Sequence, residues 1–140
     1  MISTTLWKKY NAVLIDIEKN SRTSNVIGEY AEELVAKVTN GKPARNSQEG
    51  YDVIAGKTKI QVKATRDCEL KTSTGYFHNL KFDKFIGMVF DKEGNLVKVV
   101  EMSKRKARRI GHGRSSWSIS WGRLVKEGHD ITKKYINVTL

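Results

Sequence analysis

A carboxylate, an amide and a lysine stand close together around one turn in this sequence. Asp52 directly precedes the apolar pair Val53-Ile54, and Gln61 and Lys63 lie two positions apart in the next apolar segment. A glycine-containing turn at residues 56–58 joins the two segments and predicts a β-hairpin. Because successive side chains of a strand point to opposite faces, we expect Gln61 and Lys63 on one face of the second strand.

These residue types together suit metal-assisted cleavage of a phosphodiester. Mg²⁺ prefers hard oxygen ligands, which the Asp52 carboxylate, the Gln61 amide and the backbone carbonyl of Val62 can supply. Lys63 can hold the attacking water or offset charge on the phosphate. The alternative is a solvent-facing row of polar side chains, because two further lysines of the hairpin follow the same alternation.

A predicted helix at about residues 24–39 supplies further acids. Its apolar stripe recurs at three- and four-residue steps, and Asn40-Gly41 is a typical helix end. Measured from the centre of this stripe, Glu29 points almost directly away, whereas Glu32 and Glu33 lie on its two flanks. Helical geometry therefore disfavours Glu29 as a third metal ligand and leaves Glu32 and Glu33 open. All three can also be surface acids that the helix macrodipole favours.

Three segments in this order resemble the PD-(D/E)XK nuclease superfamily. They are Gly28-x-x-Ala31-Glu32-x-x-Val35, then Gly50-Tyr51-Asp52-Val53-Ile54, then Ile60-Gln61-Val62-Lys63-Ala64-Thr65. Within the superfamily the likeness is to small restriction-endonuclease-like proteins and to archaeal-type Holliday junction resolvases. The resemblance covers about residues 24–102.

The resemblance implies a role for four residues and for a metal. Glu32 would be the acid of the helix, Asp52 the central metal-binding acid and Lys63 the catalytic lysine, with Mg²⁺ as cofactor and Mn²⁺ as a substitute. Gln61 takes the place of the usual second acid. Since an amide carries no charge, weaker metal affinity is expected, and the family includes both active and degenerate members with this substitution. Tyr51 also stands where the family often has proline, a change that the family tolerates.

Positive charge is concentrated towards the C-terminal end. The formal net charge is +11 with a pI near 9.8, and residues 103–140 hold ten Lys or Arg against two acids. Such a balance favours an anionic partner, most commonly nucleic acid, over a merely solvated basic surface. The candidate DNA contacts lie on a predicted short helix at 103–110 and the loop after it: Lys104, Arg105, Lys106, Arg108, Arg109, His112 and Arg114.

The rest of the composition disfavours a disulfide, a zinc site, a membrane protein and a secreted protein. Cys68 is the only cysteine, so neither an intramolecular disulfide nor a four-cysteine zinc site is expected. The three histidines lack metal-ligand spacing. No apolar run approaches the roughly 18 residues of a membrane span, and the N-terminal residues lack the layout of a signal peptide. We therefore expect no membrane partner and a cytoplasmic location.

The predicted elements give an α/β protein of one domain, residues 1–140. We expect a restriction-endonuclease-like core, with a central mixed sheet of about four to five strands flanked by helices and a basic C-terminal extension at 103–140. Besides the elements above, the patterns predict a helix at 5–19, a loop at 67–80, strands at 85–90, 96–102 and 117–121, and a short turn with an edge strand within 123–140.

The combined expectation is a Mg²⁺-dependent DNA endonuclease. Restriction-type cleavage of duplex DNA comes first, because about 40 residues lie beyond the common core. A junction resolvase comes second. The third hypothesis is a DNA-binding module with a degenerate, inactive nuclease core. Cutting both strands of a duplex with one small domain is most simply served by a two-fold dimer, so a homodimer is expected.

Overall fold

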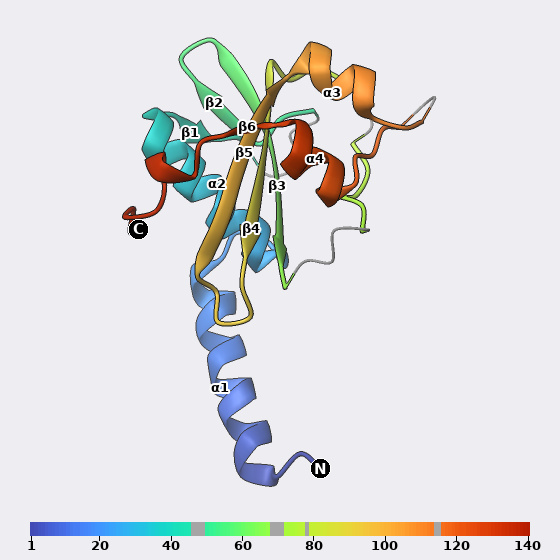
Figure 1. The fold of residues 1–140 in the computed structure, drawn as a ribbon. Helices are drawn as coiled ribbons and strands as arrows, with labels where there is room; N and C mark the ends of the chain where they lie inside the picture. Colours follow the sequence, from blue (N-terminus) through green and yellow to red (C-terminus); the bar gives the residue numbers. More distant parts are fainter. Residues whose placement is uncertain (46–49, 68–71, 78, 114–115) are drawn as a thin grey trace.

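The structure of the chain is a computed structural model, which describes residues 1–45, 50–67, 72–77, 79–113 and 116–140. It has the expected α/β architecture, built on one mixed sheet (Figure 1). The six strands follow one another across the sheet in chain order, and only β3 and β4 pair in parallel. They are β1 Lys42–Pro43, β2 Val53–Ala55, β3 Thr58–Arg66, β4 Lys84–Phe90, β5 Leu96–Ser103 and β6 His129–Asp130.

The sheet has more strands than the four to five expected. The strands β1 and β6 are each two residues long and lie at opposite edges, where they pair with β2 and β5. The helices are α1 Thr4–Asn20, α2 Val26–Thr39, α3 Lys104–Ile110 and α4 Trp121–Glu127, with a short 3₁₀ helix at Thr132–Lys134.

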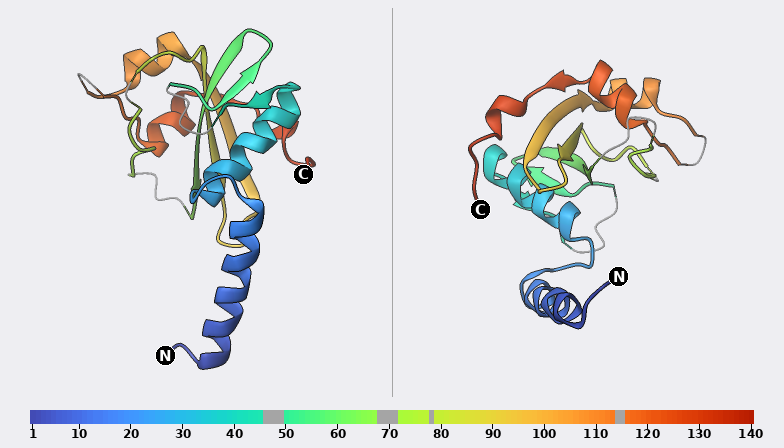
Figure 2. Two further views of the ribbon diagram at one scale, coloured as in Figure 1. Left: turned by 180° about the vertical axis from the view of Figure 1, so that it is seen from behind. Right: turned by 60° about the horizontal axis from the view of Figure 1, so that its bottom comes forward.

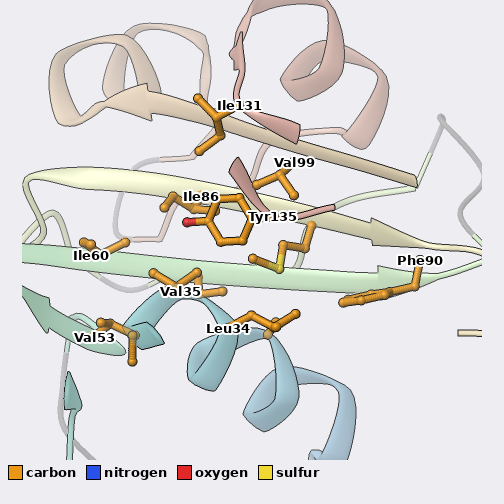
Figure 3. Packing of buried hydrophobic residues seen from close by; sticks show 13 residues of the cluster. Leu34, Val35, Val53, Ile60, Ile86, Phe90, Val99, Ile131 and Tyr135 are labelled. Carbon is orange, nitrogen blue, oxygen red and sulfur yellow. The ribbon is translucent and has the colours of Figure 1, made fainter. Parts of the chain in front are cut away.

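Both faces of the sheet are covered, and each has its own hydrophobic cluster. Leu34 and Val35 of α2 pack on one face, where Tyr135 from the C-terminal segment joins them (Figure 3). On the other face α3 and α4 pack with Phe85 of β4 (Figure 2). The segment that the sequence suggests as a basic extension therefore contributes to both clusters.

The near-continuous apolar run at 85–90 is a central strand, as predicted. Phe85 points into the cluster under α3 and α4, and Ile86 points into the cluster under α2. Gly87 follows Phe85 on the side of α4, and a Cβ there would lie 2.3 Å from Leu124 Cδ2. The helix can approach the sheet this closely because position 87 has no side chain.

The predicted hairpin forms between β2 and β3. Val53 pairs with Ile60, and Gly56 takes the positive φ of 60° that the tight connection needs. The second helix also ends as predicted, with Asn40 in the left-handed conformation at a φ of 54°.

One sequence prediction in the C-terminal part is wrong, and another is right only in part. Residues 117–121 do not form a strand, because Trp117, Ser118 and Ser120 make only isolated bridges and Trp121 already begins α4. An edge strand within 123–140 is present as β6, but α4 and the 3₁₀ helix take the place of the expected short turn. Tertiary packing overrides the alternation here, since Trp121 and Leu124 are the residues of α4 that are buried in the hydrophobic cluster.

The first helix forms as predicted but does not cover the sheet. It begins one residue before the predicted start, with Ser3 as its cap, and projects away from the body of the molecule (Figures 1 and 2). No helix of the described residues is long and apolar enough to cross a membrane.

Candidate metal and phosphodiester site

Asp52 is held at the start of β2 by hydrogen bonds on both sides of its backbone. Its N–H donates to the Ile60 carbonyl at 2.8 Å, and its own carbonyl accepts from the Ala44 N–H at 2.7 Å. These bonds fix the Asp52 backbone between the neighbouring strands. Its side chain therefore points along the edge of β3 beyond the end of the hairpin pairing.

The Asp52 carboxylate accepts a backbone hydrogen bond where the pairing of β2 with β3 has ended. Among the described residues, the pairing of β2 with β3 ends at Val53 and Ile60, so the Val62 N–H has no β2 partner. Asp52 Oδ2 accepts this N–H at 2.7 Å and also the Gln61 Nε2 amide at 2.5 Å. The N–H and C=O of one strand residue point to the same side, so the Val62 carbonyl also lies on the side of Asp52.

The Asp52 carboxyl has a raised pKa. Burial is the main cause, because removal from water disfavours the charged form. The hydrogen bond from Val62, the positive charge of Lys63 and the hydrogen bond from Gln61 oppose it without cancelling it. A buried acid with these partners is a typical feature of functional sites, although structural acids can share it.

Glu32 is the acid of α2 that shares the environment of Asp52. Its pKa is raised from 4.5 to about 7, first by burial and then by the negative charge of Asp52, while the Arg22 guanidinium opposes the rise. Glu33 is 40% exposed and pairs with Arg22 at 3.3 Å. The structure thus separates two flanking acids that helical geometry alone left equivalent.

Glu29 is engaged elsewhere. Its carboxylate accepts the backbone N–H of Arg22 at 2.8 Å and that of Thr23 at 3.1 Å, which hold the segment between α1 and α2. The backbone hydrogen bond from Arg22 is the main cause that lowers the Glu29 pKa. Glu29 therefore serves the connection between the helices.

Arg22 is a neighbour of the site that the sequence did not indicate. Its guanidinium lies 3.3 Å from Glu29, 3.7 Å from Glu32 and 3.3 Å from Glu33. It therefore acts as a counter-ion for the whole acidic face of α2. A single arginine seven to eleven residues before three acids has no local signature, so only the path of the linker reveals this contact.

Lys63 lies on the side of β3 opposite to α2. Ile60 and Val62 pack into the cluster under α2, so the alternating residues Gln61 and Lys63 face the other way. Lys63 Nζ lies 3.4 Å from the Tyr76 carbonyl oxygen, and its charge lowers the pKa of Asp52. The ammonium group and the Asp52 carboxylate therefore interact electrostatically.

The donors of this site fit Mg²⁺ but form a sparse set. The described residues contain no group of three or more His, Cys, Asp or Glu that could hold a metal. The available oxygens come from Asp52, Glu32, the Gln61 amide and the Val62 carbonyl, and Mg²⁺ is commonly held by only one or two carboxylates plus water and phosphate. The negative charge of Asp52 contributes to the raised pKa of Glu32, and a divalent cation between the two acids would offset this repulsion.

The predicted DNA contacts lie mainly on α3, which is at the end of the sheet opposite to α1 (Figure 1). Ala107 and Ile110 are its buried residues, and Ser103 caps it, accepting from the Lys106 N–H at 3.2 Å. Arg114 lies outside the described residues. The exposed basic side chains are Lys104, Arg105, Arg108 and Arg109, followed by His112 in the loop, whereas Lys106 is half-buried.

No family model matches the sequence, and no curated protein matches it.

Proposed function

We propose that the protein is a Mg²⁺-dependent DNA endonuclease of the PD-(D/E)XK type. The observation that carries the proposal is the Asp52 carboxylate on the open edge of β3, which accepts hydrogen bonds from Gln61 and Val62 and interacts electrostatically with Lys63 and Glu32. These residues are distant in the sequence and come from a helix, a strand start and a second strand. Their types are those that phosphodiester hydrolysis requires.

In this proposal Asp52 and Glu32, with oxygens of Gln61 and Val62, hold the metal. Bound there, Mg²⁺ or Mn²⁺ would supply a Lewis acid for the phosphate and a water of lowered pKa. Gln61 now uses its amide N–H to hold Asp52, which leaves its carbonyl oxygen as the end that can bind a cation. Glu32 would exchange its interaction with Arg22 for the metal.

Lys63 supplies a positive charge that needs no metal. Its ammonium group would hold a water against the phosphate or stabilise the negative charge that develops on the phosphate oxygens. Because the neighbouring Asp52 is buried, the electrostatic interaction of Lys63 with groups at this site is stronger than it would be in bulk water.

Duplex DNA cleaved at a specific sequence remains the first substrate class, with a four-way junction second. The exposed basic side chains of α3 would contact phosphates and add affinity without sequence information.

A second candidate function is DNA binding without cleavage. It is favoured by one observation: where a second acid would complete the metal site, Gln61 donates a hydrogen bond to Asp52 instead. Such a bond can stabilise an acid that no longer binds metal.

Plasmid nicking tests the proposal. Wild type should nick supercoiled plasmid with Mg²⁺ and not with EDTA, and Lys63→Ala should lower the rate by about 10²–10³-fold. Lys59→Ala is the matched control, because this lysine lies on the same strand with its Nζ 5.3 Å from the centre of the Tyr51 ring.

Binding without metal-dependent nicking would support the inactive module. Equal nicking by wild type and Lys63→Ala would contradict the mechanism. A synthetic junction compared with linear duplex separates the two substrates.

A further inference from the structure

The first helix carries an apolar face that has no partner among the described residues. α1 is described throughout and buries none of its residues. Its exposed fractions reach 55% at Leu6, 57% at Trp7, 55% at Tyr10 and 56% at Val13. Figure 2 shows that the helix stands apart from the sheet and from the other helices. A helix of this length with several β-branched and aromatic residues is marginal alone in water, so packing against a partner would stabilise it.

The apolar residues have the spacing of a coiled-coil seam. Leu6, Tyr10, Val13 and Ile17 follow one another at steps of four, three and four residues. This is the alternation of the two apolar positions in a heptad. Trp7 and Leu14 flank one side of the seam, and Lys9 and Asp16 flank the other.

The charges of α1 oppose the dipole of their own helix. Lys8 and Lys9 lie towards the N-terminus, whereas Asp16 and Glu18 lie towards the C-terminus, and the first turn contains no acid. Lys19 in the last turn is the one charge of α1 that lies at the favoured end. An isolated helix prefers the reverse order. An antiparallel neighbour removes the conflict, because each end then lies beside the opposite end of the other helix.

The flanking charges distinguish the two possible orientations. In an antiparallel pair, the flank that carries Lys9 and Asp16 meets the same flank of the second copy. Lys9 then lies opposite the partner's Asp16, and two-fold symmetry makes this ion pair twice. In a parallel pair, Lys9 would instead face the partner's Leu14, and the complementary charges would not meet.

We propose that α1 is a self-association helix, which packs antiparallel against α1 of a second copy of this chain. Leu6, Tyr10, Val13 and Ile17 form the contact, with Lys9–Asp16 ion pairs on its flank. A membrane surface fits less well, because α1 has three Lys against two acids and lacks a strongly basic polar face. The proposal does not depend on nuclease activity.

Charge exchange in the full chain tests the pairing and its orientation. Sedimentation equilibrium should show a wild-type dimer that Lys9→Glu and Asp16→Lys each weaken by about tenfold, since each places like charges together twice. The double variant should regain the wild-type affinity. A mixture of the two single variants should form heterodimers, because both of their cross-pairs join opposite charges.

Lys8→Glu is the matched control. It makes the same charge change at the neighbouring position, outside the flank, and should leave dimerisation unchanged. Circular dichroism on each variant checks that the helix persists. A wild type that stays monomeric would overturn the proposal, as would single and double variants of equal affinity. A monomer that binds vesicles of anionic lipid would assign the helix to a membrane surface and overturn it too.

Discussion

Two acids from different elements share one partly buried location, and this has a consequence for stability. The Glu32 pKa is about 7 in the folded protein, against an ordinary value of 4.5. The folded state therefore holds this proton more tightly than the unfolded chain does. The stability that protonated Glu32 contributes is complete below pH 4.5 and is lost as the pH rises through about 7.

Glu32→Gln should remove this pH dependence. Relative to wild type, the variant should gain on the order of 2 kcal/mol in free energy of unfolding between pH 4.5 and pH 8. Urea unfolding at both pH values measures the difference. Glu33→Gln removes the adjacent acid of α2, and we expect it to keep the wild-type pH dependence. A Glu32→Gln curve parallel to that of wild type would show that the folded protein does not raise the Glu32 pKa.

Metal binding at the same pair should appear as thermal stabilisation. A cation that binds only the folded state raises the Tm, by roughly 3–4 °C for each kcal/mol of linkage in a chain of this size. Mg²⁺ should therefore raise the Tm of wild type, and EDTA should reverse the rise. Asp52→Asn should abolish most of the effect, and an equal rise in both proteins would place the cation elsewhere.

Gln61→Glu tests why the site is sparse. Restoring an acid removes the amide donor to Asp52 and adds a like charge, so the metal-free protein should melt at a lower temperature. The same charge should reduce the Mg²⁺ concentration at the midpoint of the Tm rise by about tenfold. A variant with an unchanged midpoint would show that position 61 is not a ligand.

At the scale of residues, part of the candidate site could be predicted from the sequence. Strand alternation suffices to place Gln61 and Lys63 on one face, and the hairpin register brings Asp52 alongside. It does not separate Glu32 from Glu33, because both flank the apolar stripe and only the position of α2 on the sheet decides between them. The Arg22 contact depends on the path of a linker, which no periodic pattern describes.

At the scale of elements, long and strongly patterned segments were predictable and the short C-terminal one was not. The segment 117–121 alternates, yet its opposite chain at 72–77 includes Gly75 with a φ of 84° and offers only isolated bridges. Ser120 instead accepts from the Arg123 N–H at 3.2 Å and caps α4. A local cap and the burial of Trp121 override the two-residue period here.

The close approach of α4 to β4 gives a direct test of this packing. Gly87→Ala should destabilise the fold by about 1–3 kcal/mol through overpacking, because its Cβ would meet Leu124 and Trp121. In a Leu124→Ala background the added methyl has room, so the same substitution should cost less. Urea unfolding of the four proteins gives this coupling, and an equal cost in both backgrounds would place the helix farther from the strand.

At the scale of the whole molecule, the two most distinctive surfaces lie at opposite ends. The helix α1, for which we propose self-association, projects from one end of the sheet, and the basic helix α3 lies at the other (Figure 1). Two copies joined through α1 would therefore keep both α3 surfaces free. This arrangement lets dimerisation and DNA binding be tested separately.

DNA binding through α3 should depend on salt in proportion to the charges removed. Arg105 and Arg109 are one turn apart and exposed, so each can neutralise one phosphate. The double variant Arg105→Gln/Arg109→Gln should reduce the slope of log affinity against log salt by about 2, and weaken binding about equally on unrelated duplex sequences. Fluorescence anisotropy in EDTA, over a series of salt concentrations, measures this slope without cleavage.

Lys8→Gln/Lys19→Gln removes the same charge from the outer face of α1 and should leave the slope as in wild type, because a local contact depends on where the charge lies. Equal slopes for both double variants would mean that only net charge attracts DNA, and α3 would lose its assigned role.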